Sequence, residues 1–170
     1  MLTQDRLKEL FNYDSATGVF TRIKTTSSRA MKGFIAGSVS SHGYLRIRID
    51  GRVYFAHRLA WLYEFGEFPL GIMDHINGDR KDNRIINLRQ ASLSQNGFNR
   101  RMQSTNKSGV KGVSWSNRDN KWRAVIMHEG KSINVGYFTE KNAAADAIEK
   151  KRSELHGEFA NSGIELEAAQ

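Results

Sequence analysis

Polar side chains between residues 72 and 99 have the types and spacing needed to cleave a phosphodiester. A short apolar approach leads to Asp74 and His75, Asn87 begins an Asn-Leu-Arg run, and Asn96 lies in a segment of helix-forming residues. Such a layout can place a hard oxygen ligand and a general base on one strand and a second oxygen ligand on a helix. The stretch is therefore typical of a single-metal phosphodiesterase.

The segments around these side chains are predicted to form strand, turn, strand and helix in that order. Residues 71–77 and 87–91 are the two strand arms, joined by a charged turn. Residues 92–101 follow as a helix, with Ser92 as its N-cap and Leu93 packing inward.

His57 begins a predicted helix over residues 57–65, which Pro69 prevents from continuing. Two roles are open for this histidine: it lines the candidate site, or it caps and packs the helix. Packing is favoured, because a histidine at a helix start is often structural.

The N-terminal region is predicted to contain short elements. Residues 2–11 have the apolar spacing of a helix capped by Thr3, residues 12–18 are rich in turn formers, and residues 19–23 form a short strand. Residues 25–41 are predicted to be an exposed loop.

A β-hairpin is predicted from residues 44–49 and 52–56, because an Asp-Gly turn at 50–51 separates two alternating runs. One face of the first strand is apolar and the other carries Arg46 and Arg48. These arginines are either solvated or aligned along a phosphate backbone, and the sequence leaves both interpretations open.

The stretch IMDHINGDRKDNRIINLRQASLSQNGFN (72–99) resembles the HNH endonuclease motif, in the subgroup of bacteriophage homing-type nucleases. The preceding AHRLAWLYEFGEFP (56–69) is similar to the helix that leads into that motif. The resemblance covers about residues 44–101, with the motif core at 56–101. It implies a ββα-metal nuclease domain.

The resemblance also implies roles for single residues. Asp74 and Asn96 would bind a divalent ion, Mg²⁺ or Mn²⁺, and neutral His75 would accept a proton from the attacking water. Asn87 would tie the return arm to the first arm. The chain has no cysteine, so no structural zinc is expected.

The second half has a different pattern. Strands are predicted at 112–115, 121–128 and 132–138, with a Glu-Gly turn between the last two, and a helix then runs from a Thr139 cap to His156. In the middle strand, Trp122, Ala124 and Ile126 alternate with Arg123, Val125 and Met127, so the first set is predicted to meet the helix.

This half is similar to the AP2-type DNA-binding domain in the residues GVSW (112–115), KWRA (121–124) and VGYF (135–138). The resemblance covers about residues 106–161 and implies a three-stranded sheet in the major groove with the helix behind it. At Ser114, Val125 and Met127 the chain departs from the polar or charged residues typical of the plant members, so no base specificity is carried over.

Composition points to a polyanionic partner. The 170 residues include 26 Lys and Arg against 18 Asp and Glu, a net charge of +8, which favours phosphate binding. The predicted contacts to double-stranded DNA are Arg46, Arg48, Arg89, Asn99, Arg100, Arg101, Lys107, Lys111, Ser114, Arg123, Ser132 and Asn134.

The predicted fold class is α+β, an HNH nuclease domain followed by a small antiparallel sheet with a helix. The expected domains are 1–101 for the N-terminal region and nuclease, 102–110 for a basic linker, 111–161 for the AP2-like domain and 162–170 for a tail. The polar N-terminus and the lack of a long apolar run predict a cytoplasmic protein with no membrane segment, phage-encoded by resemblance. No heptads are present, and a monomer is expected.

Two function classes compete with a DNA-nicking endonuclease. A non-catalytic DNA-binding regulator on the same scaffold would not need Asp74, His75 and Asn96 together. An RNA-binding or RNA-cleaving protein fits the charge, but not a sheet that enters a major groove.

Overall fold

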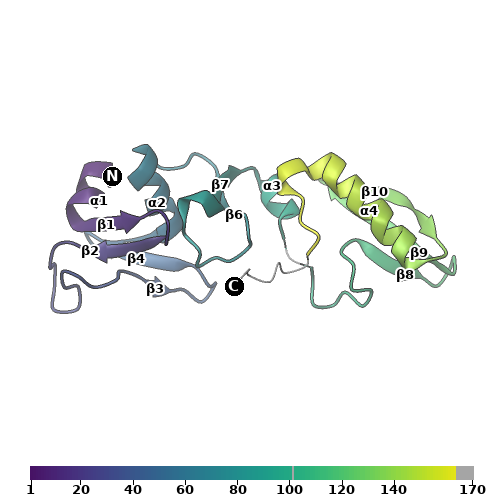
Figure 1. The fold of residues 1–170 in the computed structure, drawn as a ribbon, viewed down its shortest axis with the longest axis horizontal. Coiled ribbons are helices and arrows are strands. Elements are labelled where there is room, and N and C mark those ends of the chain that lie inside the picture. The colour runs from purple at the N-terminus through teal and green to yellow at the C-terminus, as the bar shows by residue number, and fades with distance from the viewer. Residues whose placement is uncertain (101, 164–170) are drawn as a thin grey trace. The chain divides into compact units, whose positions relative to one another are not determined.

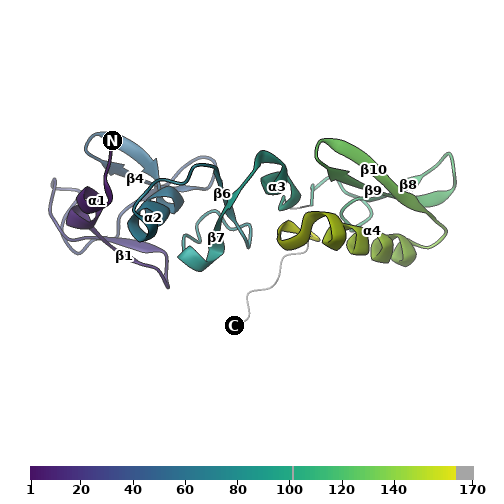
Figure 2. The same ribbon diagram turned by 90° about the horizontal axis from the view of Figure 1, so that it is seen from above.

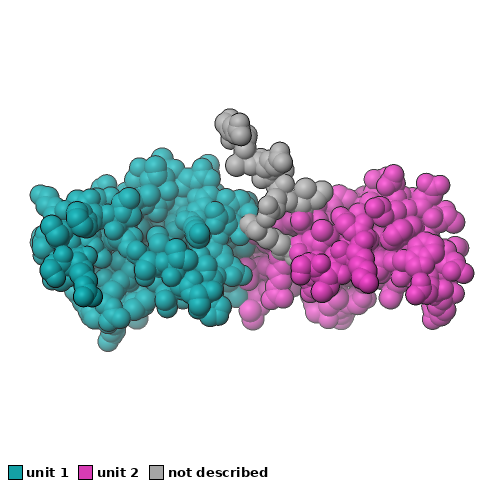
Figure 3. Space-filling model, turned by 90° about the horizontal axis from the view of Figure 1, so that it is seen from below, with its two compact units in different colours: residues 1–90 teal, residues 91–170 magenta. Residues whose placement is uncertain are grey.

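A computed structural model describes residues 1–100 and 102–163. The contacts between residues divide the chain into two compact units, 1–90 and 91–170 (Figure 3). Each unit has its own cluster of buried apolar side chains. The mixture of helices with small antiparallel sheets confirms the α+β class (Figure 1).

The units meet in sequence between Gln90 and Ala91, whereas the linker was predicted at 102–110. A boundary between compact units does not show where one function ends and the next begins. The domain limits predicted from the sequence therefore remain a prediction. Arg101, a predicted DNA contact, and tail residues 164–170 lie outside the described residues.

The N-terminal unit begins with helix α1 (Gln4–Leu10), whose first turn is capped by the predicted Thr3 hydroxyl. Strands β1 (Phe11–Asp14) and β2 (Val19–Arg22) then pair antiparallel. Strand β1 corrects the prediction of a turn-rich segment there. Its side chains alternate between buried and exposed, which is strand periodicity that the turn-forming residue types obscured.

A three-stranded sheet follows, with β3 (Ser38–Val39), β4 (Leu45–Ile49) and β5 (Arg52–Phe55) in that order. The β4–β5 hairpin confirms the prediction, and both residues of its Asp-Gly turn have positive φ, 47° and 79°. Strand β3 lies inside the segment predicted to be an exposed loop.

Helix α2 (Ala56–Phe65) ends at the predicted residue, Phe65, and its C-cap is Gly66. Gly66 adopts the left-handed conformation, φ 82°, and its N–H bonds back to the Leu62 carbonyl. This glycine C-cap, and not the proline, is the physical stop.

The predicted arms of the site are strands β6 (Ile72–His75) and β7 (Leu88–Ala91), which pair in a two-stranded sheet, with the short 3₁₀ turn η1 (Ile85–Asn87) before β7. Met73 and Leu88 belong to the N-terminal core together with α1 and α2 residues. The core therefore fixes both arms.

The C-terminal unit begins with helix α3 (Leu93–Phe98), and its sheet has the order β10 (Lys131–Phe138), β9 (Lys121–His128), β8 (Val113–Ser116), all antiparallel. Helix α4 (Lys141–His156) packs on one face of this sheet, followed by the 3₁₀ turn η2 (Gly157–Phe159) (Figure 2). Ala124 and Ile126 of β9 are buried in one cluster with Ile148 of α4, as predicted.

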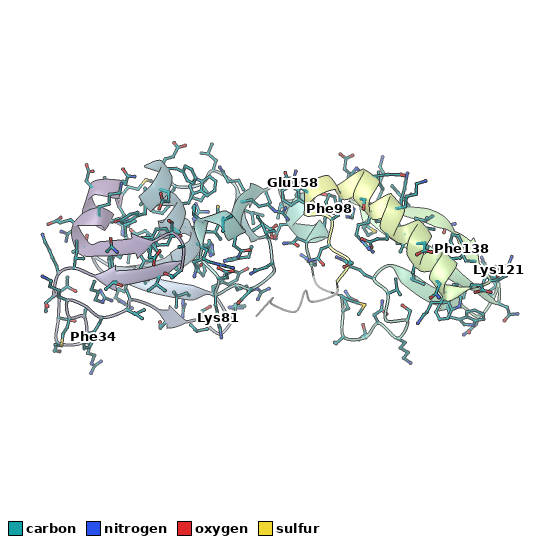
Figure 4. The ribbon with its side chains drawn as sticks, viewed as in Figure 1. Phe34, Lys81, Phe98, Lys121, Phe138 and Glu158 are labelled. Carbon is teal, nitrogen blue, oxygen red and sulfur yellow. The ribbon has the colours of Figure 1, made fainter. Side chains whose placement is uncertain are left out.

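Two helix predictions need correction. Helix α3 is shorter than predicted and Leu93 is 81% exposed. The helix packs instead through Phe98 (labelled in Figure 4), whose ring stacks on that of His156. Helix α4 has Glu140 at its N-cap with no side-chain bond, so Thr139 does not cap it. The predicted end at Gly157 is confirmed.

Candidate active site

Asp74 and His75 lie at the end of β6, and both are buried, with 5% and 4% of their surface exposed. The apolar residues before them enter the core, and the backbone turns sharply after them, where the Gly78 N–H bonds to the His75 carbonyl at 2.8 Å. Gly78 has φ 71°, a conformation that suits glycine. Core packing on one side and a tight turn on the other therefore fix the pair.

Asp74 forms a buried ion pair with Arg89 of the neighbouring strand β7. The Nε and Nη2 atoms of Arg89 both lie 2.9 Å from Oδ2 of Asp74. Arg89 was predicted to contact DNA. The structure instead places its guanidinium on the candidate metal-binding carboxylate, where it balances the buried negative charge.

His75 is surrounded by other rings. The ring of His57 lies 5.1 Å from it and nearly perpendicular, and the Tyr44 ring lies at 6.0 Å. Burial lowers the pKa of His75, so the imidazole is neutral at pH 7. A neutral imidazole is the form that can accept a proton.

His57 is a packing residue, as favoured from the sequence, and the residue against which it packs is His75. Only 7% of His57 is exposed, and its ring also stacks on Phe55 at 5.4 Å. The two roles left open for this histidine are therefore not exclusive.

Asn87 joins the return arm to the loop that follows His75. Its Oδ1 accepts a hydrogen bond from the Asn77 N–H at 3.0 Å, and its Nδ2 donates to the Asp82 carbonyl at 2.9 Å. The backbone carbonyl of Asn87 accepts from Ile76 N–H at 2.9 Å. These bonds tie the start of the return arm to the loop, and the implied role of Asn87 at the reaction stays a prediction.

Asn83 is a residue of this loop that the sequence did not single out. It is almost fully buried, its Nδ2 donates to the Lys81 carbonyl, and its own carbonyl accepts from the Tyr13 hydroxyl at 2.7 Å. The backbone of this loop passes very close to Gly18. A Cβ atom added to Gly18 would lie only 2.5 Å from the backbone nitrogen of Arg84. Turn-forming and charged residues around Asn83 are typical of an exposed loop, so the sequence does not indicate that Asn83 is buried.

Asn96 and Asn99 are carried by α3 and its C-cap. A capping box fixes the start of α3, in which Ser92 accepts from Gln95 N–H and the Gln95 side chain accepts in return. Asn96 is half-buried and belongs to the C-terminal unit, so its pairing with Asp74 stays a prediction. Asn99 is buried, and both of its oxygens accept hydrogen bonds from Asn161 Nδ2, so its role as a DNA contact stays a prediction.

Most of the other predicted DNA contacts are exposed: Arg46, Arg48, Arg100, Lys107, Ser114, Arg123, Ser132 and Asn134. Strand register brings several together, because Ser114 pairs with Arg123 and Ser132 pairs with Met127. Directly paired residues share a face, so the predicted outer face of the C-terminal sheet exists as a surface.

Lys111 departs from the prediction of a phosphate contact. Its ammonium donates to the carbonyls of Phe98 and Asn161, each at 2.9 Å, and to that of Arg100. The three N–H donors of the ammonium are therefore matched by three backbone carbonyl acceptors. Burial lowers the pKa of Lys111 to about 8, with the charge of Arg152 acting in the same direction. Lys111 is a structural residue.

Residues 54–98 match the profile of the HNH endonuclease family. Protein 3.8 of Escherichia phage T7 is 36% identical over 105 residues, which cover 61% of this chain and 86% of that protein. The chain belongs to the HNH endonuclease family. Family membership confirms the prediction of an HNH endonuclease.

This HNH endonuclease is also 33% identical over 96 residues to a mimivirus protein (Acanthamoeba polyphaga mimivirus) named Uncharacterized HNH endonuclease L560. The alignment covers 56% of the chain and 49% of L560, so it spans about half of that relative. A solved structure titled for DNA binding and cleavage by the HNH homing endonuclease I-HmuI aligns over 91% of this chain and 88% of its own, at 16% identity and TM-score 0.41. A TM-score this low does not establish a common fold.

The matched segment contains all of α2, β6 and β7, so the buried Asp74–His75 pair lies inside the family region. Among the described residues, no helix has the length and apolar composition needed to cross a bilayer.

Proposed function

We propose that this HNH endonuclease is a divalent-metal-dependent, homing-type enzyme that hydrolyses one strand of double-stranded DNA. The observation that carries the proposal is the buried, neutral His75 beside the buried carboxylate of Asp74, inside the family segment. A neutral imidazole next to a hard oxygen ligand is the pair that water activation at a phosphodiester requires.

The chain's residues divide the chemistry between them. His75 accepts the proton of the attacking water, and the hydrogen bonds of Asn87 hold the loop after His75 against the return arm. Asp74 and Asn96 would bind the cation, Mg²⁺ or Mn²⁺. When bound, such an ion stabilises the charge on the phosphate and on the departing 3′ oxygen.

The donor chemistry fits a hard ion with few protein ligands. Mg²⁺ keeps several waters and is usually held by one or two carboxylates plus substrate phosphates. Among the described residues, no group of three or more His, Cys, Asp or Glu side chains converges. Asp74 with one amide oxygen matches that ligand preference, with water and DNA completing the coordination. Without the ion, Arg89 pairs with the carboxylate.

The C-terminal unit is proposed to anchor the enzyme on DNA in the manner of an AP2-type domain. It has the sheet and backing helix that the resemblance implies, and its outer face carries Arg123, Ser114 and Asn134. Val125 and Met127 lie on the same face, so thymine methyl contact suits it as well as phosphate contact.

One site per chain cuts one strand, so a monomer is proposed to nick, in the cytoplasm of a bacterial host. The test is conversion of supercoiled plasmid to open circle by wild type, His75→Ala and the matched control His42→Ala, with Mg²⁺, Mn²⁺ or chelator. His42 is exposed and far from β6 in sequence. We expect metal-dependent nicking by wild type and the control, and a loss of roughly 100-fold or more in His75→Ala.

Equal nicking by His75→Ala would exclude His75 as the base. If wild type binds the plasmid with steep salt dependence but never cuts it or phage genomic DNA, a non-catalytic DNA-binding regulator becomes the better assignment.

A further inference from the structure

The ring of His57 is part of a cluster that encloses the proposed base. We define the ring cluster as Tyr44, Phe55, His57 and His75. Within it, His57 contacts all three other rings, with centroids 5.4 Å from Tyr44, 5.4 Å from Phe55 and 5.1 Å from His75. Phe55, His57 and His75 come from β5, α2 and β6, and Tyr44 directly precedes β4, so tertiary packing assembles the cluster.

The contacts of His57 orient it against His75. Phe55 stacks on His57 nearly parallel, at 9°, and the His75 ring meets it almost perpendicular, at 89°. The edge-to-face arrangement is a preferred geometry for such rings and restricts rotation of both. Tyr44 contacts His57 and His75 alike, and the Arg80 guanidinium covers the Tyr44 ring at 4.9 Å.

Hydrogen bonding does not explain a histidine at this position. Nδ1 of His57 is buried and has no hydrogen-bond partner among the described residues. Because Nδ1 makes no such bond, the ring itself, rather than this nitrogen, is what His57 contributes to the cluster.

We infer that His57 is a positioning residue, which fixes the imidazole of His75 by ring contact so that its nitrogen faces the attacking water. This rests on the proposed role of His75 as the general base. A few tenths of an ångström to one ångström of misplacement is enough to lower a rate strongly, because proton transfer depends on near-attack geometry.

A neutral ring suits this position. His57 lies in the first turn of α2, where the helix dipole disfavours a cation, and burial lowers its pKa to about 3. When His75 becomes an imidazolium during the reaction, an uncharged π-system beside it is favourable, whereas a second cation would oppose proton uptake.

The test compares two substitutions that both fill the space of the imidazole. His57→Phe keeps a ring for the edge-to-face contact, and His57→Leu removes it. In the full-length protein with Mg²⁺, we expect the single-turnover nicking rate of the Leu variant to fall about 10-fold or more, and that of the Phe variant to stay within about 3-fold of wild type. Affinity for the plasmid should stay within about 2-fold in both, because His57 is buried and is not one of the predicted DNA contacts.

A second readout does not depend on nuclease activity. Ring resonances of His75, assigned with His75→Gln, should remain sharp in wild type and His57→Phe and broaden in His57→Leu through rotamer exchange. Thermal unfolding of both variants checks that the comparison is made on folded protein.

An unchanged rate and unchanged His75 resonances in His57→Leu would overturn the inference. So would a Phe variant as slow as the Leu variant, since a ring nitrogen of His57 would then be required. If wild type does not nick at all, the proposed function fails, while the His75 resonances still decide whether His57 positions that ring.

Discussion

Burial gives the histidines at residues 57 and 75 their chemical character. Both rings are removed from water, so both favour the neutral form, and only His75 is followed by a turn that leads out of the core. The carboxylate of Asp74 beside them is paired with Arg89 on the next strand. One neutral base and one compensated carboxylate can therefore coexist in adjacent positions of β6.

The depressed pKa of His57 predicts acid sensitivity of the fold. In the unfolded chain this imidazole binds a proton near pH 6.5, but in the native state only near pH 3, so the unfolded state binds more protons in between. The contribution of neutral His57 to the free energy of unfolding is therefore complete above pH 6.5 and is lost as the pH falls from 6.5 towards 3. We expect wild type to lose about 2 kcal/mol more than His57→Phe between about pH 7 and pH 5.

Urea unfolding at several pH values measures this difference. His42→Gln serves as the control, because His42 is exposed, and its pH dependence should match that of wild type. Parallel curves for wild type and His57→Phe would show that His57 does not stay neutral in the native protein.

Helix α3 is short, and the elements around it hold it in the C-terminal unit. Its last residue Phe98 stacks on His156 of α4 at 3.7 Å, and Asn99 receives two hydrogen bonds from Asn161. Lys111 adds the third connection by capping carbonyls at the end of the helix. A helix of this length has little stability of its own, so these contacts position Asn96.

Substituting Lys111 tests this anchoring. Lys111→Met keeps the apolar stem but removes the ammonium from the carbonyls of Phe98, Arg100 and Asn161. We expect a loss of roughly 2–3 kcal/mol in the free energy of unfolding, because buried acceptors lose their donor. The exposed Lys107→Met should change stability by less than about 0.5 kcal/mol, and equal effects in thermal or urea unfolding would contradict the structural role.

At the scale of the whole chain, each unit folds around its own apolar cluster, and the net charge of +8 is spread over both. Such a charge favours association with DNA through release of counterions. Net charge alone does not say which surface binds.

The salt dependence of DNA affinity identifies the surface. Arg123 is exposed on the outer face of β9, and Lys150 is exposed on α4, two residues from buried Ile148. We expect Arg123→Gln to reduce the slope of log affinity against log salt by about 1, and Lys150→Gln to leave it unchanged. Fluorescence anisotropy with a duplex measures both, and the reverse result would place the helix face on the DNA.

Local patterns were sufficient for the family, the β4–β5 hairpin, the C-terminal sheet and the order of Asp74, His75 and Asn87. These features depend on spacing along the chain, on turn residues and on strand alternation, all of which are encoded within a few positions. Strand β1 shows the limit, since its turn-forming residue types obscure the strand periodicity of its side chains. The end of α2 at Phe65 is predicted correctly, but Gly66 rather than Pro69 stops the helix.

Only the tertiary structure decided how the charged and aromatic side chains are used. Arg89 and Lys111 look like DNA contacts in the sequence, yet one neutralises Asp74 and the other caps α3. His57 and His75 are 18 positions apart and meet only because α2 and β6 pack into one core. Such pairings depend on which distant elements become neighbours, and on the loss of water around them, neither of which a local pattern specifies.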